Sequence, residues 1–412
     1  MTLSLTDPTL LRNQAYINGE WLGADDGATL AVANPATGET ITHIAKVGAA
    51  ETRRAIEAAE QAMAEWRHVP AKVRAQTLRA WFDLVMANQE DLAMIMTAEQ
   101  GKTLAESRGE VAYGAAYIEW FAEQAKRIDG DVIPSPGRDK RIVCIKQPVG
   151  VCAAITPWNF PNAMITRKAA PALAAGCTVV IKPASETPLS ALALAELAHR
   201  AGIPAGALNV VAGSSGAIGG ELTANPAVRK LTFTGSTPVG KMLEEQCAAT
   251  LKKTSMELGG NAPFIVFEDA DLDAAVQGAM ISKYRNSGQT CVCSNRLLVH
   301  EAVAEEFTAR LAAATAELTL GNGAHEGVNL GPLVNQKAVA DVDELVQSTL
   351  AAGAKLVLGG QPSALGPCFY EPTILTGVTA DMAVFRNEIF GPVAPIVTFS
   401  SEEEAIAIAN DT

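Results

Sequence analysis

The sequence predicts an α/β fold built around a parallel sheet with helices on both faces. From Arg141 onwards, short apolar runs rich in Val and Ile alternate with amphipathic stretches, and this alternation is typical of βαβ units. The chain has 412 residues, whereas single cores stop growing at roughly 250 to 300 residues. We therefore expect two or three domains, preceded by a segment to about Arg127 that is mostly helical by pattern.

Apolar residues spaced three and four positions apart predict helices in the leading segment, at 49–66, 71–89 and 91–98. The Val- and Ile-rich runs predict strands at 150–155, 177–182, 208–211, 230–234 and 263–267. Helical patterns at 189–200 and 239–249 lie between these strands. The series predicts a doubly wound, Rossmann-like domain.

A second α/β domain is expected in the C-terminal part of the chain. Its elements follow in the order helix, strand and long helix, at 272–284, 296–300 and 302–318. Segments 321–334 and 359–372 are full of Gly, Pro and Asn, which predicts loops. Residues 402–412 read as a helix without a stop signal, so we expect the sequence to be C-terminally incomplete.

The composition argues against nucleic-acid and membrane partners. The formal net charge is -13 and Lys and Arg do not cluster, whereas a nucleic-acid surface needs a basic patch. The N-terminus lacks a basic start with an apolar run, and no apolar stretch approaches the roughly 20 residues that span a bilayer. We therefore expect a cytoplasmic protein. Seven cysteines do not suggest a disulfide framework, and we expect most to be buried, among them Cys152, Cys177 and Cys247.

The segment GQTCVCSN, residues 288–295, places Cys291 among small, turn-forming polar residues. Such surroundings suit an accessible nucleophile, although a single cysteine in a loop is more often without a catalytic role. Upstream, Glu257 ends a strand pattern directly before a glycine pair. A carboxylate in an apolar setting has a raised pKa and suits a general base, but Glu257 taken alone could equally be a surface residue. In TPWNFP, two prolines could hold the Asn159 amide still, and a fixed amide can stabilise an oxyanion.

Six segments match, in this order, the signature segments of one protein family: TPWNFP, VIKPASETP, FTGSTPVG, MELGGNAP, GQTCVCSN and NEIFGP. From about Ala15 to its last residue the chain therefore resembles the aldehyde dehydrogenase superfamily, and it is most similar to the succinate-semialdehyde dehydrogenases. The resemblance implies a Rossmann-like cofactor domain and a second α/β catalytic domain. The implied boundaries are 1–127 with 148–258 for the cofactor domain, 128–147 for an oligomerisation segment and 259–412 for the catalytic domain.

The resemblance implies four catalytic residues. Cys291 is the nucleophile that forms a thioester, and Glu257 is the base that activates water for deacylation. Asn159 and the backbone N–H of Cys291 form the oxyanion hole. Lys168 matches a lysine credited with proton relay, and an ordinary helix lysine is an equally good interpretation.

The resemblance also implies NADP or NAD as cofactor, and no metal ion. Lys182 and Ser185 are assigned to the adenosine ribose, Gly235 and Ser236 to the pyrophosphate, and Glu388 to the nicotinamide ribose. The same channel is lined by Thr156, Trp158, Leu258 and Phe390. Four residues separate Gly235 from Gly240, which departs from the usual dinucleotide fingerprint, but the pair follows a predicted strand and opens a helix. NADP is favoured because Ser185 could donate to a 2′-phosphate, unless Glu186 turned inward.

Two arginines, Arg167 and Arg285, flank the segments of Asn159 and Cys291 and are expected to bind a distal carboxylate of the substrate. The alternative is a pair of surface arginines in structural ion pairs. The resemblance favours succinate semialdehyde, with glutarate semialdehyde as another candidate. A homo-oligomer is expected for a complete chain.

Two other functions stay open at this point. A CoA-acylating relative would pass the acyl group to CoA, although Glu257 favours water. A catalytically silent, truncated relative would keep only the fold. Cys293 reads most simply as a small residue lining the pocket, but it could also form a reversible disulfide with an oxidised Cys291.

Overall fold

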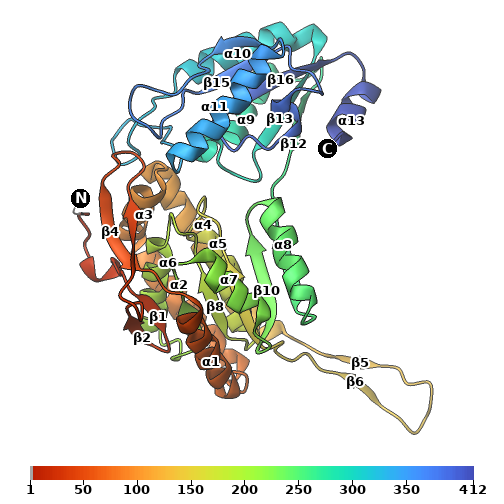
Figure 1. Cartoon of the computed structure of the whole chain (residues 1–412). Helices are drawn as coiled ribbons and strands as arrows, with labels where there is room; N and C mark the ends of the chain where they lie inside the picture. The colour runs from red at the N-terminus through yellow and green to blue at the C-terminus, as the bar shows by residue number, and fades with distance from the viewer. Residues whose placement is uncertain (1–2) are drawn as a thin grey trace. The chain divides into compact units, whose positions relative to one another are not determined.

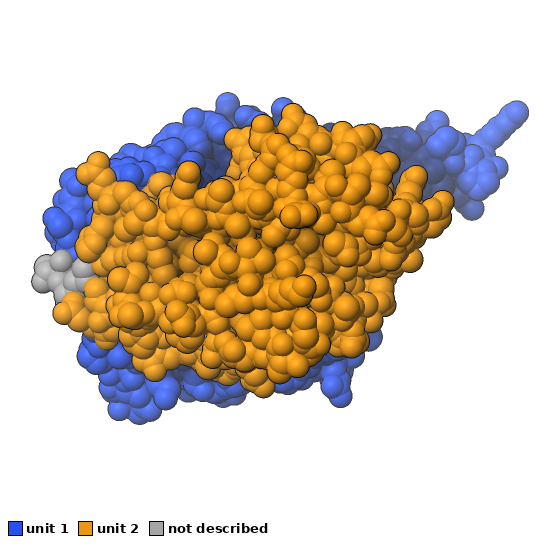
Figure 2. Space-filling view, turned by 90° about the horizontal axis from the view of Figure 1, so that it is seen from above, with its two compact units in different colours: residues 1–33, 40–99, 107–257 blue, residues 34–39, 100–106, 258–412 orange. Residues whose placement is uncertain are grey.

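The chain forms two compact units in the computed structural model, which describes residues 3–412. Unit 1 comprises residues 1–33, 40–99 and 107–257, and unit 2 comprises 34–39, 100–106 and 258–412 (Figure 2). The main boundary therefore falls between Glu257 and Leu258.

A seven-stranded sheet forms the centre of unit 1, in the order β11-β10-β7-β8-β9-β1-β2. The five strands from β11 to β9 are parallel, and β1 and β2 add an antiparallel edge. The strands are β1 (Ala15–Ile17), β2 (Glu20–Leu22), β7 (Val151–Ile155), β8 (Val179–Lys182), β9 (Leu208–Val210), β10 (Val228–Thr234) and β11 (Lys253–Glu257). Strands β7, β8 and β9 are mostly apolar in sequence because they are buried throughout.

Eight helices belong mainly to unit 1. They are α1 (Ala49–Trp66), α2 (Ala71–Ala87), α3 (Gln89–Gln100), α4 (Leu104–Gln124), α5 (Ala163–Ala174), α6 (Leu189–Arg200), α7 (Ser215–Ala224) and α8 (Thr237–Ala248), with short turns η1 (Pro8–Leu10) and η2 (Ala125–Arg127). Helices α2, α5 and α6 pack together, and α7 packs against both α1 and α8. A core that includes Leu78, Trp81, Leu173 and Leu192 joins helices of the leading segment to the helices of the sheet.

Two pairs of strands lie outside this sheet. Strands β3 (Thr29–Ala33) and β4 (Thr40–Ala45) form one antiparallel pair, and β5 (Asp131–Ile133) and β6 (Ile142–Cys144) form the other. The β5–β6 hairpin projects from the rest of unit 1 (Figure 1) and exposes apolar side chains. Val132 is 76% exposed, Val143 63% and Ile145 68%.

Unit 2 contains a five-stranded sheet in the order β12-β13-β16-β15-β14, parallel except for β14. The strands are β12 (Ala262–Val266), β13 (Ser294–His300), β14 (Lys355–Leu358), β15 (Thr373–Thr376) and β16 (Val393–Phe399). The helices are α9 (Leu272–Tyr284), η3 (Arg285–Gly288), α10 (Glu301–Ala316), α11 (Gln336–Ala351), α12 (Ala383–Arg386) and α13 (Glu402–Asn410). Two apolar clusters, around Phe385 and Phe307, form its core.

The predicted α/β class and its alternating elements are confirmed, with most boundaries shifted by one or two residues. The leading segment is less purely helical than its pattern suggests, because strands β1 to β4 precede α1. These strands are three to six residues long, too short for a clear periodic signal. Within residues 3–412, no helix is both long and apolar enough to cross a bilayer.

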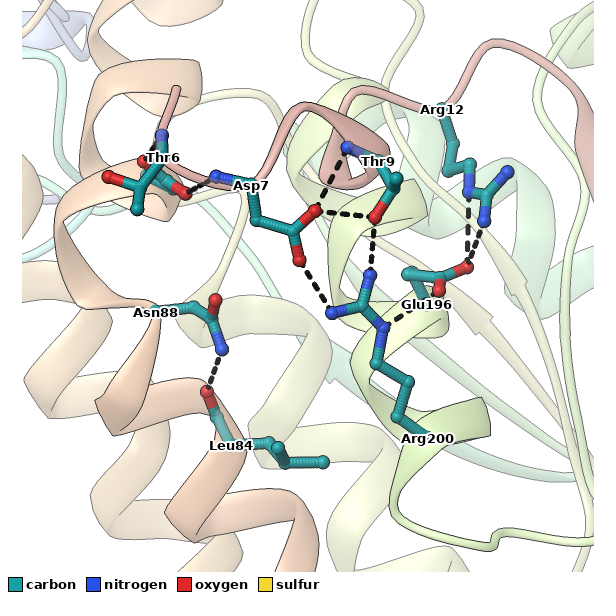
Figure 3. Close-up of polar contacts among 9 residues, drawn as sticks. Thr6, Asp7, Thr9, Arg12, Leu84, Asn88, Glu196 and Arg200 are labelled. Atoms are coloured by element: carbon teal, nitrogen blue, oxygen red, sulfur yellow. Dashed lines mark hydrogen bonds and ion pairs between the residues drawn. The ribbon is translucent and has the colours of Figure 1, made fainter.

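Side chains fasten the N-terminal segment to two helices (Figure 3). Asp91 of α3 accepts hydrogen bonds from the backbone N–H groups of Thr6 (2.8 Å) and Asp7 (2.7 Å). Arg200 of α6 pairs with Asp7 at 2.6 Å and with Glu196 at 2.8 Å. The segment is thereby held by charge-assisted bonds.

Two buried glutamates of the leading helices cap helices of the sheet. Glu99 accepts bonds from the backbone N–H groups of Leu189 (2.7 Å) and Ser190 (2.8 Å) at the start of α6. Glu110 accepts from the N–H groups of Asn162 (2.9 Å) and Ala163 (3.2 Å) at the start of α5. Neither α5 nor α6 has a hydrogen-bonded side-chain cap of its own, so these carboxylates satisfy N–H groups that would otherwise lack partners.

Candidate active site

A cavity of about 520 Å³ opens at the carboxyl ends of β7, β8 and β10 in unit 1. It contains all the predicted cofactor residues of this unit: Thr156, Trp158, Lys182, Ser185, Gly235 and Ser236. Crevices at the carboxyl ends of parallel strands are where doubly wound folds bind nucleotides.

The polar groups of this cavity suit a phosphorylated ligand. Ser236 is the N-cap of the 12-residue helix α8, whose free N–H groups and dipole favour an anion. The hydroxyls of Thr156 and Thr234 are buried and have no hydrogen-bond partner among the described residues, so a polar ligand would satisfy them. Both Ser185, half-buried, and Glu186, exposed, line the cavity.

A second cavity of about 450 Å³ in unit 1 brings together Arg167, Lys168 and Glu257. Lys168 is buried and its Nζ donates to Thr232 Oγ1 at 3.2 Å. Burial and, to a smaller extent, the positive charge of Arg167 lower the pKa of Lys168 to about 8, and Glu257 opposes the shift. An amine with such a pKa can take up and release a proton near neutral pH.

The expectation that Glu257 lies in apolar surroundings is wrong, because its side chain is exposed in the structure. Glu257 does end a strand, as the pattern predicts, but β11 lies at the edge of the seven-stranded sheet. No other strand within residues 3–412 covers that edge, so alternate side chains of β11 reach solvent. No apolar enclosure therefore surrounds this carboxylate.

The two arginines lie in different surroundings. Arg167 of α5 is half-buried, with its guanidinium carbon 5.3 Å from the centre of the Tyr117 ring, and Nη1 lies 3.7 Å from the Met164 sulfur. Within the described residues it forms no ion pair, so the guanidinium keeps its capacity to bind a carboxylate. Arg285, in unit 2, is exposed.

The loop before Cys291 has an unusual backbone. Asn286, Ser287 and Gly288 adopt φ values of 51°, 55° and 74°, a left-handed conformation that costs energy in residues other than glycine. At Gly288, a Cβ atom would lie 2.0 Å from the carbonyl oxygen of Gly391. The segments that carry Cys291 and Glu388 therefore approach each other so closely that only glycine fits.

Hydrogen bonds fix this loop within unit 2. Asn286 N–H donates to Glu106 Oε1 at 2.6 Å, and Ser287 Oγ donates to Gly331 O at 2.8 Å. The fully buried Gln289 accepts from Val334 N–H at 2.9 Å. These hydrogen bonds hold the strained backbone of the loop in place.

The two cysteines of the loop differ in exposure. Cys291 is half-buried, whereas Cys293 is buried and its thiol donates to the carbonyl groups of Ser282 (3.1 Å) and Lys283 (3.3 Å) at the end of α9. Burial raises the pKa of Cys293, and the Lys283 ammonium opposes the shift. Of the two thiols, Cys291 is therefore the more exposed.

Glu388 lies over the glycine pair of MELGGNAP. Its Oε1 accepts from Gly260 N–H at 3.3 Å, and a Cβ atom on Gly259 would come within 2.3 Å of Oε2. Burial raises the pKa of Glu388, while the Gly260 N–H and the Lys283 ammonium lower it. Gly259 and Gly260, which follow Glu257 closely in the sequence, thus make room for the carboxylate of Glu388.

Comparison with known proteins agrees with these features. A model of the aldehyde dehydrogenase family matches residues 21–412. The chain belongs to this family.

Relatives within the aldehyde dehydrogenase family are similar over the whole chain. A glutarate-semialdehyde dehydrogenase of Pseudomonas aeruginosa is 62% identical, covering 100% of this chain and 85% of the relative. The NADP(+) succinate-semialdehyde dehydrogenase of Escherichia coli is 58% identical with the same coverage. The crystal structure of succinate-semialdehyde dehydrogenase from Burkholderia pseudomallei superposes with a TM-score of 0.98 at 61% identity, over 99% of this chain and 85% of that chain.

Three side chains that join signature segments of this aldehyde dehydrogenase were missed from the sequence: Asn261, Asn295 and Arg296. Arg296 is fully buried and donates to the carbonyl oxygen of Asn261 from Nε (3.0 Å) and Nη2 (2.8 Å). Both Asn261 and Asn295 lie within signature segments, but an asparagine in a sequence does not reveal a hydrogen-bond partner about 100 positions away. Among residues 3–412, no group of three or more His, Cys, Asp or Glu side chains is arranged to hold a metal ion.

Proposed function

We propose that the chain oxidises succinate semialdehyde to the dicarboxylate, with NADP+ or NAD+ as hydride acceptor. The observation that carries the proposal is Cys291, a partly exposed thiol on a backbone fixed by Gly288 and its neighbours. A relative with 62% identity is a glutarate-semialdehyde dehydrogenase, and one with 58% identity is a succinate-semialdehyde dehydrogenase; both substrates carry a distal carboxylate. Family membership supplies the reaction class, and the cavity in unit 1 suits the cofactor.

The chain's own residues divide the work into two stages. The Cys291 thiolate adds to the aldehyde carbon, and the Asn159 amide and the Cys291 N–H stabilise the oxyanion. A bound nicotinamide would supply the hydride acceptor, and loss of hydride from the adduct would leave the carbon as a thioester on Cys291. Glu257 then removes a proton from water, which hydrolyses the thioester, and Lys168 relays that proton towards solvent.

Six of the residues proposed to hold the cofactor line the cavity of unit 1, and the other three, Leu258, Glu388 and Phe390, belong to unit 2. We assign Lys182 and Ser185 to the adenosine ribose, and Gly235 and Ser236 to the pyrophosphate at the start of α8. Glu388 is assigned to the nicotinamide ribose. The remaining assigned residues are Thr156, Trp158, Leu258 and Phe390. Ser185 favours NADP+, since a hydroxyl donates to a 2′-phosphate that a carboxylate would repel.

Arg167 and Arg285 are proposed to bind the distal carboxylate of the substrate. Glutarate semialdehyde, longer by one methylene, is a second candidate because the 62% identical relative acts on it. The discriminating measurement is kcat/KM for both semialdehydes and for neutral aldehydes of equal length. Equal use of the neutral aldehydes would contradict a carboxylate-binding role.

Cys291→Ala and Glu257→Gln test the two stages separately. Cys291→Ala should abolish oxidation and retain cofactor binding, because the thiol acts only on the aldehyde. Glu257→Gln should release one equivalent of reduced cofactor in a burst and then stall, because only hydrolysis needs the base. Steady-state rates like those of the unaltered enzyme in either variant would show that the assignment is wrong.

Two further proposals concern the setting of the enzyme. We propose that the exposed apolar hairpin at 128–147 joins subunits of a homo-oligomer, and chromatography of a Val143→Glu variant would test this. We also propose a cytoplasmic location. All seven cysteines lie within residues 3–412 and none forms a disulfide, which suits a reducing compartment.

A further inference from the structure

The backbone on either side of Glu388 is held by one side chain, Asn295. Asn295 is the second residue of β13 and is 3% exposed. Its Nδ2 donates to the carbonyl oxygen of Asn387 at 2.8 Å, and its Oδ1 accepts from Ile389 N–H at 3.0 Å. The amide therefore bonds to both neighbours of Glu388, as a paired strand would.

A second amide fixes the orientation of the first. Asn295 Nδ2 also donates to Asn261 Oδ1 at 2.6 Å, and Asn261 Nδ2 donates to Phe385 O at 2.9 Å. Both protons of the Asn295 amino group are thus used, and its oxygen accepts one bond. If the Asn295 amide were flipped, its oxygen would face two acceptors and its amino group would face an N–H. The network accordingly selects a single orientation.

The carboxylate of Glu388 is confined from the opposite side. Its Oε1 accepts from Gly260 N–H, and the missing Cβ of Gly259 leaves room for Oε2. The backbone of residues 387–389 is held by Asn295, and the side chain between them is held by the glycine pair. A carboxylate fixed at both ends loses little conformational freedom when it accepts hydrogen bonds from a ligand.

We propose that Asn295 is a positioning residue, which sets the Glu388 carboxylate to accept hydrogen bonds from the vicinal hydroxyls of the nicotinamide ribose. The inference rests on the proposed function, since it takes Glu388 as a group that binds the cofactor. Asn295 itself touches neither substrate nor cofactor. It acts through the backbone of Asn387 and Ile389.

The test compares NADP+ with adenosine 2′,5′-bisphosphate, a fragment that lacks the nicotinamide ribose. Asn295→Ala removes the bonds to Asn387 and Ile389, so it should weaken NADP+ binding about tenfold and leave binding of the fragment unchanged, as measured by calorimetry. A merely structural defect would weaken both probes. In the presence of Glu388→Gln, Asn295→Ala should cause no further loss of NADP+ affinity.

Asn209→Ala is the matched control. Asn209 is a buried amide in unit 1 that accepts from Asn18 N–H at 2.9 Å and donates to Gly206 O at 2.7 Å, so its loss costs similar bonds far along the chain from Glu388. It should leave the ratio of the two affinities unchanged. If Asn295→Ala does not fold, Asn295→Asp keeps the acceptor for Ile389 and loses the donor, and it should weaken NADP+ selectively as well.

The outcomes separate the two proposals. The positioning role would be overturned if the folded variant of Asn295 bound both probes equally more weakly, or bound NADP+ as tightly as before, while the unaltered enzyme oxidised the semialdehyde. An unaltered enzyme that binds NADP+ no better than the fragment would overturn the role of Glu388 and the inference with it. An unaltered enzyme that binds neither probe and oxidises no semialdehyde would overturn the proposed function.

Discussion

Replacing Gly288 by alanine should both destabilise the fold and slow catalysis. Alanine at φ 74° carries a left-handed penalty of about 1 to 2 kcal/mol. In addition, its Cβ would lie 2.0 Å from the carbonyl oxygen of Gly391, where real contacts are never under 3.0 Å. One of the two backbones must therefore move by about 1 Å, and overpacking of this kind costs a further 1 to 3 kcal/mol, roughly. Cys291 follows three residues later, and a misplacement of about 1 Å can lower a rate about 100-fold.

Gly377→Ala is the matched control for this prediction. Gly377 also lies in unit 2 with a φ of 66°, but no atom lies within 4 Å of its Cβ position. The Gly377→Ala variant should lose only the stability that corresponds to the left-handed penalty, and it should keep its activity. The assays are urea unfolding for stability and the pre-steady-state burst of reduced cofactor for acylation. A Gly288→Ala enzyme with the stability and burst rate of Gly377→Ala would refute the argument from close approach.

Three more results are expected. Since the pKa of Lys168 is lowered to about 8, its amine is charged below that pH and neutral above it. A plot of kcat against pH should therefore rise through an apparent pKa near 8, and Lys168→Met should abolish this rise. An unchanged pH profile in the variant would exclude a proton relay through Lys168. Ser185→Glu should shift the ratio of kcat/KM values about tenfold towards NAD+ by repelling the 2′-phosphate, and an enzyme that already ignores NADP+ would refute the role of Ser185. If oxidised Cys291 forms a disulfide with Cys293, peroxide should inactivate the enzyme and dithiothreitol should restore its activity. The Cys293→Ala variant should then not recover, and equal recovery of both proteins would rule out a protective disulfide.

The sequence predicts the strands of unit 1 well where they are buried on both faces. Strand β8 begins with the apolar run 179–181 because neither of its faces meets water. Helix α7 is harder to predict, since three glycines in SGAIGGELTA lower its helix propensity. Its contacts with α1 and α8 stabilise it, and no local pattern reveals them.

The candidate site divides in the same way. Candidate residues such as Cys291 and Glu388 can be proposed from the sequence because each motif is local. The exposure of Glu257 depends on which strand forms the sheet edge, and that is a property of topology rather than of neighbouring residues. Asn295 bonds to residues 92 and 94 positions away, and a single sequence carries no spacing that predicts such a pair.

The capping of α5 and α6 by Glu110 and Glu99 has a consequence for biosynthesis. The ribosome completes the leading helices before the segment from Asn162 to Ser190 emerges. Until then each buried carboxyl group lacks the N–H groups that satisfy it, and a polar group without partners resists burial. The leading helices therefore cannot complete their packing into the core before the strands and helices that follow them in the chain are present. A fragment ending before residue 160 should accordingly remain protease-sensitive, whereas one that extends past α8 should become resistant.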